Sequence, residues 1–270
     1  MLVVGDSFPW GDGVHPEDVY PSRLERRLNE RESELEFEVV NWSHTGWNTA
    51  QAFSSVKGSI GWLEPDLLIL GFVLNDAEPF RPAEHEAMRT ELGRHSPRNA
   101  LSVLLHGRSR VYRLFWERLE NTRQRRAFTA YYHSLYEGPG WAECQAALKK
   151  FKNRSQQNGV PLLLVVFPIF DSQLDASYPY VDLHRKVRRA AKEIGIPSLD
   201  LLRAYRGIDA RRLAVTPFTD PHPNELAHRV AADRLVRYLI KQGLAPIRDE
   251  DSSEATPDQA QVDAVAVEVS

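Results

Sequence analysis

The side chains best suited to chemistry lie near the two ends of the chain, a serine early and a histidine late. Ser7 follows the apolar run 1–4 and the pair Gly5-Asp6. Such an apolar run is typical of a buried strand in a parallel sheet. The end of that strand lies at the edge where open α/β sheets bind ligands. A serine there can act as a nucleophile if a histidine reaches it, and is otherwise an ordinary loop residue.

A histidine with a neighbouring acid lies in the segment before the last helix. His222 and Asp220 belong to the proline-bounded stretch 216–224, which we expect to be a loop. In a doubly wound sheet this loop lies at the same edge as the end of the first strand. A base that reaches a serine and is oriented by an acid forms a triad, which is defined by geometry and not by chain order. For a histidine taken alone, a buried structural role is the competing interpretation.

Strands and helices alternate in the sequence in a way that brings these residues together. A glycine-rich loop is expected at 8–14, and helices are expected near 21, from 49, across 141–151, 181–194 and 225–242. Between them, strands are expected at 1–4, 37–41, 67–73, 160–168 and 196–200. This rhythm predicts a doubly wound parallel sheet.

The composition excludes several classes of protein. The net charge of −3 gives no basic excess for nucleic acid. A single cysteine, Cys144, excludes an internal disulfide and a cysteine-built zinc site, and the histidines lack ligand spacing. We therefore expect neither a metal nor a cofactor.

No targeting or membrane-spanning segment is visible. The chain has no apolar run of the ~20 residues that span a bilayer, and no signal peptide. The expected location is the cytoplasm by default. Because the first strand starts at Met1, an anchor upstream of this sequence is left open.

The alternation breaks between about residues 78 and 140, where no strand is expected. This insertion has helical apolar spacing from Leu101 to Leu119 and many arginines. It is either a helical pair with a solvated basic face or a cap that helps to select an anionic or sugar substrate. We expect one domain over 1–246 with this insertion, followed by a disordered acidic tail at 247–270.

Four short blocks carry a family resemblance, which covers about residues 1–76 and 140–242. The blocks resemble those of the SGNH (GDSL-type) hydrolase superfamily and read Gly5-Asp6-Ser7, Gly46, Asn75-Asp76 and Asp220-Pro221-His222-Pro223-Asn224. The resemblance implies a three-layer α/β/α sandwich of flavodoxin-like type with a five-stranded parallel sheet.

The resemblance also implies roles for individual residues. Ser7 would be the nucleophile, His222 the general base and Asp220 the acid that orients the base. The oxyanion hole would consist of the backbone N–H groups of Ser7 and Gly46 and the side-chain amide of Asn75. Such fixed donors stabilise a tetrahedral intermediate. A glycine at 46 permits close approach of its N–H.

The sequence departs from the family pattern at two places. The family's usual acid lies three residues before the histidine, where this chain has Thr219; Asp220 lies only two before it. A Ser7–His222 dyad helped by a backbone carbonyl is therefore the alternative to a triad. The glycine expected two residues before Asn75 is replaced by Val73.

The implied activity is that of a GDSL-type serine esterase that works through an acyl-enzyme. The expected substrate is a small-molecule or carbohydrate ester, an O-acetyl ester first of all. Acyl transfer to a sugar hydroxyl and a catalytically inactive carbohydrate-binding module are the alternatives. Three aromatic residues flank the motifs and are expected either to pack or to stack on sugars: Trp10, Trp42 and Trp47. The oligomeric state is left open.

Overall fold

The computed structural model describes residues 1–31, 33, 35–79, 105, 108–217 and 220–246. The acidic tail and most of the first part of the insertion therefore lie outside the described residues. Within the described part of the chain, no helix is long and apolar enough to cross a membrane.

A five-stranded parallel sheet forms the centre of the fold, as predicted. Its strand order is β2-β1-β3-β4-β5, and neighbouring strands pair in parallel throughout. The strands β1, β3 and β4 are completely buried, which explains why they are continuous apolar runs. The five strands are β1 (Leu2–Val4), β2 (Val40–Asn41), β3 (Leu68–Phe72), β4 (Leu162–Val166) and β5 (Ser198–Asp200).

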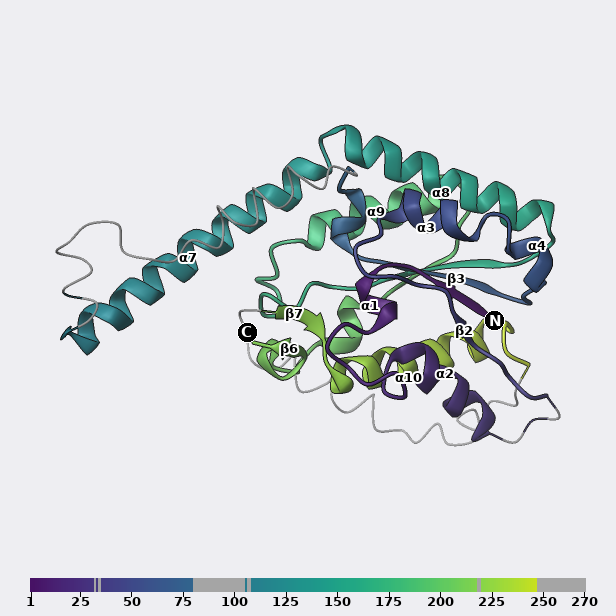
Figure 1. The fold of residues 1–270 in the computed structure, drawn as a ribbon, viewed down its shortest axis with the longest axis horizontal. Helices are drawn as coiled ribbons and strands as arrows, with labels where there is room; N and C mark the ends of the chain where they lie inside the picture. The colour runs from purple at the N-terminus through teal and green to yellow at the C-terminus, as the bar shows by residue number, and fades with distance from the viewer. Residues whose placement is uncertain (32, 34, 80–104, 106–107, 218–219, 247–270) are drawn as a thin grey trace, which may run out of the picture.

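Helices cover both faces of the sheet, which gives the predicted three layers (Figure 1). One face carries α2 (Tyr20–Asn29) and α10 (Glu225–Lys241), which pack against each other. The other carries α3 (Thr49–Val56), α8 (Pro139–Gln157) and α9 (Val181–Glu193). The short helix α4 (Ile60–Leu63) lies at the amino ends of the strands. The buried side chains of all layers form one continuous hydrophobic core.

The described part of the insertion is mainly one long helix, α7 (Arg110–Leu135). Figure 1 shows this helix leaving the body of the molecule at an angle. The helical spacing was therefore predicted correctly over 110–119, but it does not mark a buried face, because Val111, Leu114 and Phe115 are exposed.

Short elements at the carboxyl edge of the sheet differ from the prediction. The expected loop after Ser7 begins with a one-turn helix, α1 (Ser7–Trp10). The expected loop 216–224 contains a strand, β7 (Asp220–Pro223), which pairs antiparallel with β6 (Ala214–Thr216). Three 3-10 turns complete this edge: η1 (Leu74–Ala77), η2 (Leu201–Tyr205) and η3 (Ala210–Arg212).

Candidate active site

Ser7 is the first residue of the short helix that follows β1. The Asp6 carboxylate accepts the backbone N–H of Phe8 at 3.0 Å and so caps this helix. The residue before Asp6 must be glycine, because a Cβ on Gly5 would lie 2.8 Å from the carbonyl oxygen of Gly71 in the neighbouring strand. The tight approach of β1 to β3 and the cap therefore fix the direction in which the Ser7 hydroxyl points.

His222 is held by the β6–β7 hairpin and the start of α10. Asn224 caps α10, because its side-chain oxygen accepts the backbone N–H groups of Leu226 and Ala227 at 3.1 and 3.2 Å. Its side-chain nitrogen donates to the carbonyl oxygen of Ala214 in β6 at 3.1 Å. Asn224 thus connects the β6–β7 hairpin to α10, and this connection fixes the position of His222 in β7.

The structure brings Ser7, His222 and Asp220 together in hydrogen-bonding contact. The Nε2 atom of His222 lies 2.9 Å from the Oγ atom of Ser7, across 215 residues of sequence. The Nδ1 atom lies 2.5 Å from the Oδ1 atom of Asp220, which also accepts the backbone N–H of His222 at 3.1 Å. With Nδ1–H donating to the carboxylate, Nε2 is free to accept the Ser7 proton.

The unusual spacing of Asp220 and His222 has a simple structural explanation. Both residues lie in β7, and side chains two apart in an extended strand point to the same side. The carboxylate therefore reaches the imidazole from two positions before it. Thr219, at the family's usual position, lies outside the described residues.

A second histidine, His228, shows what a structural histidine looks like in this fold. Its side chain is completely buried in α10, and its Nδ1 accepts the backbone N–H of Tyr20 at 3.1 Å. Burial lowers the pKa of His228 to about 3, so the ring stays neutral. His222, by contrast, is partly exposed and contacts a hydroxyl and a carboxylate.

Gly46 lies in the exposed loop between β2 and α3. Its φ angle is +80°, which favours glycine, and a Cβ at this position would meet no atom within 4 Å. The positive φ angle therefore gives this position a preference for glycine that does not depend on crowding by other residues of the protein. The loop is attached beside Ser7, because the backbone N–H of His44 donates to the carbonyl oxygen of Gly5 at 3.2 Å. Within the described ranges the N–H of Gly46 has no acceptor.

Asn75 lies in η1 at the end of β3, the strand next to β1. The Asp76 carboxylate fixes this turn, since it accepts the backbone N–H of Val73 at 2.7 Å and the hydroxyl of Thr49 at 2.9 Å. The side chain of Asn48 adds a bond to the carbonyl oxygen of Glu78 at 2.8 Å. These bonds connect the Asn75 turn to the helix that begins just after Gly46.

Two buried carboxyl groups lie below this edge. Burial raises the pKa of Asp6 to about 6, although the N–H of Phe8, the charge of His222 and the nearby Asn75 side chain lower it. Burial, and then the charge of Asp6, raise the pKa of Asp76 well above its usual range. Burial therefore favours the protonated form of both carboxyl groups.

Replacement of Asp6 by asparagine is expected to change how stability depends on pH. Because folding raises this pKa to about 6, the wild type loses the corresponding stability as pH rises from about 4 through 6. The free energy of unfolding of Asp6→Asn minus that of the wild type should therefore increase by about 3 kcal/mol between pH 4 and 8. The asparagine keeps the acceptor for Phe8. Urea unfolding at several pH values measures the difference, and a difference independent of pH would contradict the assignment.

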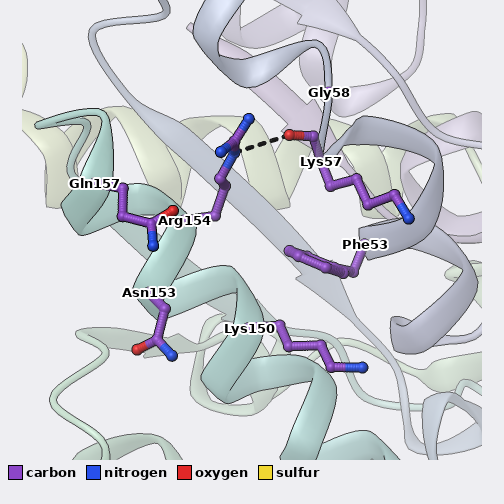
Figure 2. A pocket seen from close by; sticks show the side chains of 7 residues that line it. All are labelled: Phe53, Lys57, Gly58, Lys150, Asn153, Arg154 and Gln157. Carbon is purple, nitrogen blue, oxygen red and sulfur yellow. Dashed lines mark hydrogen bonds between the residues drawn. The ribbon is translucent and has the colours of Figure 1, made fainter.

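A cavity of about 400 Å³, whose lining residues Figure 2 shows, contains no residue of the triad. It is formed where α3 and α8 end, at the amino edge of the sheet, and its lining includes Lys57, Lys150 and Arg154. Arg154 donates to the carbonyl oxygen of Lys57 at 2.8 Å, as the dashed line in Figure 2 shows. This cavity includes none of the predicted site residues.

A second cavity, of about 170 Å³, is linked to the His222 ring through two aromatic contacts. Phe170 in its wall stacks on Phe8 with ring centroids 6.4 Å apart, and Phe8 lies 5.5 Å from the His222 ring. Five of its eight wall residues are charged or polar, and the wall consists of Arg125, Phe170, Asp171, Ser172, Gln173, Ala210, Arg211 and Pro217. Arg125 comes from α7, so the insertion contributes to the wall of this cavity. Sequence reasoning missed this wall, because its residues carry no local motif.

Among the residues that the structure describes, no group of three or more histidine, cysteine or acidic side chains could hold a metal ion. Cys144 is buried, and burial raises the pKa of its thiol, so it remains protonated.

Comparisons with solved structures place the fold. Axe2, an acetylxylan esterase from Geobacillus stearothermophilus, is 17% identical with a TM-score of 0.53, over 87% of this chain and 91% of that one. TesA is 15% identical with a TM-score of 0.52, over 88% and 96%. A two-domain esterase active on acetylated mannans is 15% identical with a TM-score of 0.53, over 92% of this chain and 50% of that one. At these identities the likeness is one of fold.

No curated protein matches the chain. A model of the GDSL-like Lipase/Acylhydrolase family, however, matches residues 3–230 and so spans β1 and all the residues of the triad. The chain therefore belongs to the GDSL-like lipase/acylhydrolase family and is a hydrolase that acts on ester bonds.

Proposed function

We propose that the protein is a serine esterase that cleaves small carboxylic esters, O-acetyl esters of carbohydrates first of all, through an acyl-enzyme. The observation that carries this proposal is the contact of 2.9 Å between Ser7 Oγ and His222 Nε2. The carboxylate of Asp220 on the other ring nitrogen supports it, because it sets the tautomer that a base needs.

The mechanism follows from these contacts. His222 takes the proton of Ser7 while Oγ attacks the ester carbonyl carbon, and Asp220 stabilises the imidazolium that forms. The backbone N–H groups of Ser7 and Gly46 and the amide of Asn75 donate to the oxyanion. The intermediate then collapses, and His222 gives its proton to the departing alkoxide. A water molecule, deprotonated by His222, attacks the acyl-enzyme; the bond between the acyl carbon and Ser7 Oγ then breaks, His222 returns its proton to Oγ, and the carboxylic acid and free Ser7 are released.

Two observations support a small acyl group and a hydroxylated alcohol. The cavity linked to the His222 ring through Phe170 and Phe8 is small, and five of its eight wall residues are charged or polar, which does not suit a long alkyl chain. In addition, several proteins of the same fold are described as esterases of acetylated polysaccharides.

A series of p-nitrophenyl esters tests the proposal. The wild type should hydrolyse the acetate with a kcat/KM at least about tenfold above that of the octanoate, because the octanoyl chain must lie against polar walls. A preference for the octanoate would overturn the small-acyl assignment. Absence of turnover on every ester would favour the inactive binding module.

Acyl transfer shares the acyl-enzyme with hydrolysis, so the geometry of Ser7 and His222 fits both. Product analysis separates them: with an acceptor sugar present, a transferase moves the acyl group to the sugar faster than to water. We expect free acetate as the main product.

Replacement of Asn75 by alanine is expected to lower kcat on p-nitrophenyl acetate by about 10²–10³-fold with little change in KM. The amide donates to the oxyanion, which forms after substrate binding, so the loss falls on the chemical step. Asn153→Ala, an exposed position in α8, is the matched control and should keep full activity. A change confined to KM would assign Asn75 to substrate binding instead.

A further inference from the structure

Three aromatic rings form a row near the segment that carries Ser7, and the third of them, Trp47, is partly buried against the core. The ring of His44 lies between two tryptophans, with its centroid 5.8 Å from that of Trp10 and 5.2 Å from that of Trp47. Trp10 is 50% exposed, and His44 is exposed as well. We call Trp10, His44 and Trp47 the aromatic row.

The aromatic row is built on the two segments that carry the reacting groups. Trp10 ends the one-turn helix that begins with Ser7, and His44 and Trp47 flank Gly46. The row therefore borders both the nucleophile and the proposed oxyanion donor.

Hydrogen bonds hold these two segments together. The hydroxyl of Thr45 donates to Asp12 at 2.6 Å, and the backbone N–H of His44 donates to the carbonyl oxygen of Gly5 at 3.2 Å. The aromatic row is thus held in place before any substrate binds, which lowers the entropy that binding must overcome.

The chemistry of the aromatic row matches a sugar ring. A pyranose presents C–H groups on its faces and hydroxyl groups at its rim, so it can stack on an aromatic face and accept hydrogen bonds at the edge. Among the described residues, no acceptor binds the indole N–H of Trp10 or Trp47, and tryptophan N–H groups usually find a partner once they are buried. An alkyl chain would bury the rings but leave these donors without partners.

We propose that the aromatic row binds a sugar ring in the alcohol part of the ester and so selects acylated carbohydrates. This inference rests on the proposed esterase function, whose substrate class it specifies. It assigns to Trp10, His44 and Trp47 a role in substrate specificity.

The test compares two acetyl esters in one variant. In Trp10→Ala, kcat/KM for acetylated xylo-oligosaccharides should fall by about tenfold or more, mainly through KM, as is typical when an aromatic contact is removed. Hydrolysis of ethyl acetate, which has no ring to stack, should stay within about twofold, since Ser7, His222 and Asp220 are unchanged. Trp10→Phe should recover most of the activity on the sugar ester.

Trp62 offers a matched control. It is 78% exposed in α4, at the end of the sheet opposite α1 (Figure 1). Trp62→Ala should leave both activities unchanged. Equal losses on both esters in Trp10→Ala, or no loss on the sugar ester, would overturn the proposal. A loss confined to p-nitrophenyl octanoate would also overturn it and assign the row to an acyl chain.

A binding measurement separates this proposal from the proposed function. Ser7→Ala protein titrated with xylopentaose should show a saturable change in tryptophan fluorescence, which the additional Trp10→Ala substitution removes. Binding of xylopentaose by a protein whose wild type hydrolyses no ester would contradict the esterase proposal and support the sugar site. Hydrolysis of acetyl esters without any binding of xylopentaose would support the esterase proposal and contradict the sugar site.

Discussion

Ser7→Ala is expected to lower kcat on p-nitrophenyl acetate by about 10⁵–10⁶-fold, the loss typical of removing a serine nucleophile whose base then has nothing to activate. The reason is the single contact between Ser7 Oγ and His222 Nε2: without the hydroxyl, the imidazole has no proton to take and no acyl-enzyme forms. The effect is measured by comparing the initial rates of the wild type and of Ser7→Ala, each corrected for the spontaneous hydrolysis of the ester.

A matched substitution controls for loss of folding. Ser54 is exposed in α3, and Ser54→Ala should keep full activity. Ser7→Ala should also unfold at a similar urea concentration to the wild type, because only one hydroxyl is removed. Residual activity within about tenfold of the wild type would place the nucleophile elsewhere.

Asp220→Asn is expected to lower kcat by about 10⁴-fold while leaving the fold intact. The carboxylate accepts a hydrogen bond from Nδ1–H, which leaves the lone pair of Nε2 for the Ser7 proton. An asparagine amide can donate to Nδ1 instead, and this places the ring proton on Nε2. The histidine then faces Ser7 as a donor and no longer as a base.

The control for this variant is a carboxylate in the same region that does not touch the imidazole. Asp209 bonds to Arg211 and Gln173. Asp209→Asn should change kcat little, and comparison of the two variants on p-nitrophenyl acetate isolates the effect of orientation. A loss below about tenfold in Asp220→Asn would show that Asp220 does not set the tautomer and would favour the dyad.

The sequence is sufficient to predict the central sheet and the edge of the sheet at which the candidate site residues lie. The apolar runs before Ser7 and Asn75 are buried strands, and their direction brings both residues to one edge. His222 was placed there by the same rule, as part of the segment that precedes the last helix. Strand ends were less accurate: 37–41 was predicted as a strand, and the structure has Val40–Asn41.

The short elements of the site were not predictable, for physical reasons. Pro221 and Pro223 argue against a strand, because proline has no N–H to donate to a neighbouring strand. The strand β7 nevertheless forms, because it pairs with the short antiparallel strand β6 and is not part of the central sheet. The helix α1 is one turn long and depends on the cap from Asp6 rather than on helix propensity. Such elements are determined by a few contacts and leave no periodic pattern.

Contacts between distant segments form the other group of features that the sequence could not reveal. The ring contacts of His44 with Trp10 and Trp47 join the end of α1 to the loop after β2, and the sequence singled out the two tryptophans but not their contact with His44. The approach of Arg125 from α7 to the wall of the small cavity is of the same kind. Both contacts depend on tertiary packing, and no local sequence pattern records them.

The most direct test of the account is to trap the nucleophile. Diethyl p-nitrophenyl phosphate, which phosphorylates activated serines, should inactivate the protein with one adduct per chain, and peptide mass analysis should map that adduct to Ser7. His222→Ala should react far more slowly, because nothing removes the Ser7 proton. An adduct on any other residue, or inactivation that leaves Ser7 unmodified, would contradict the claim that Ser7 is the hydroxyl activated by His222.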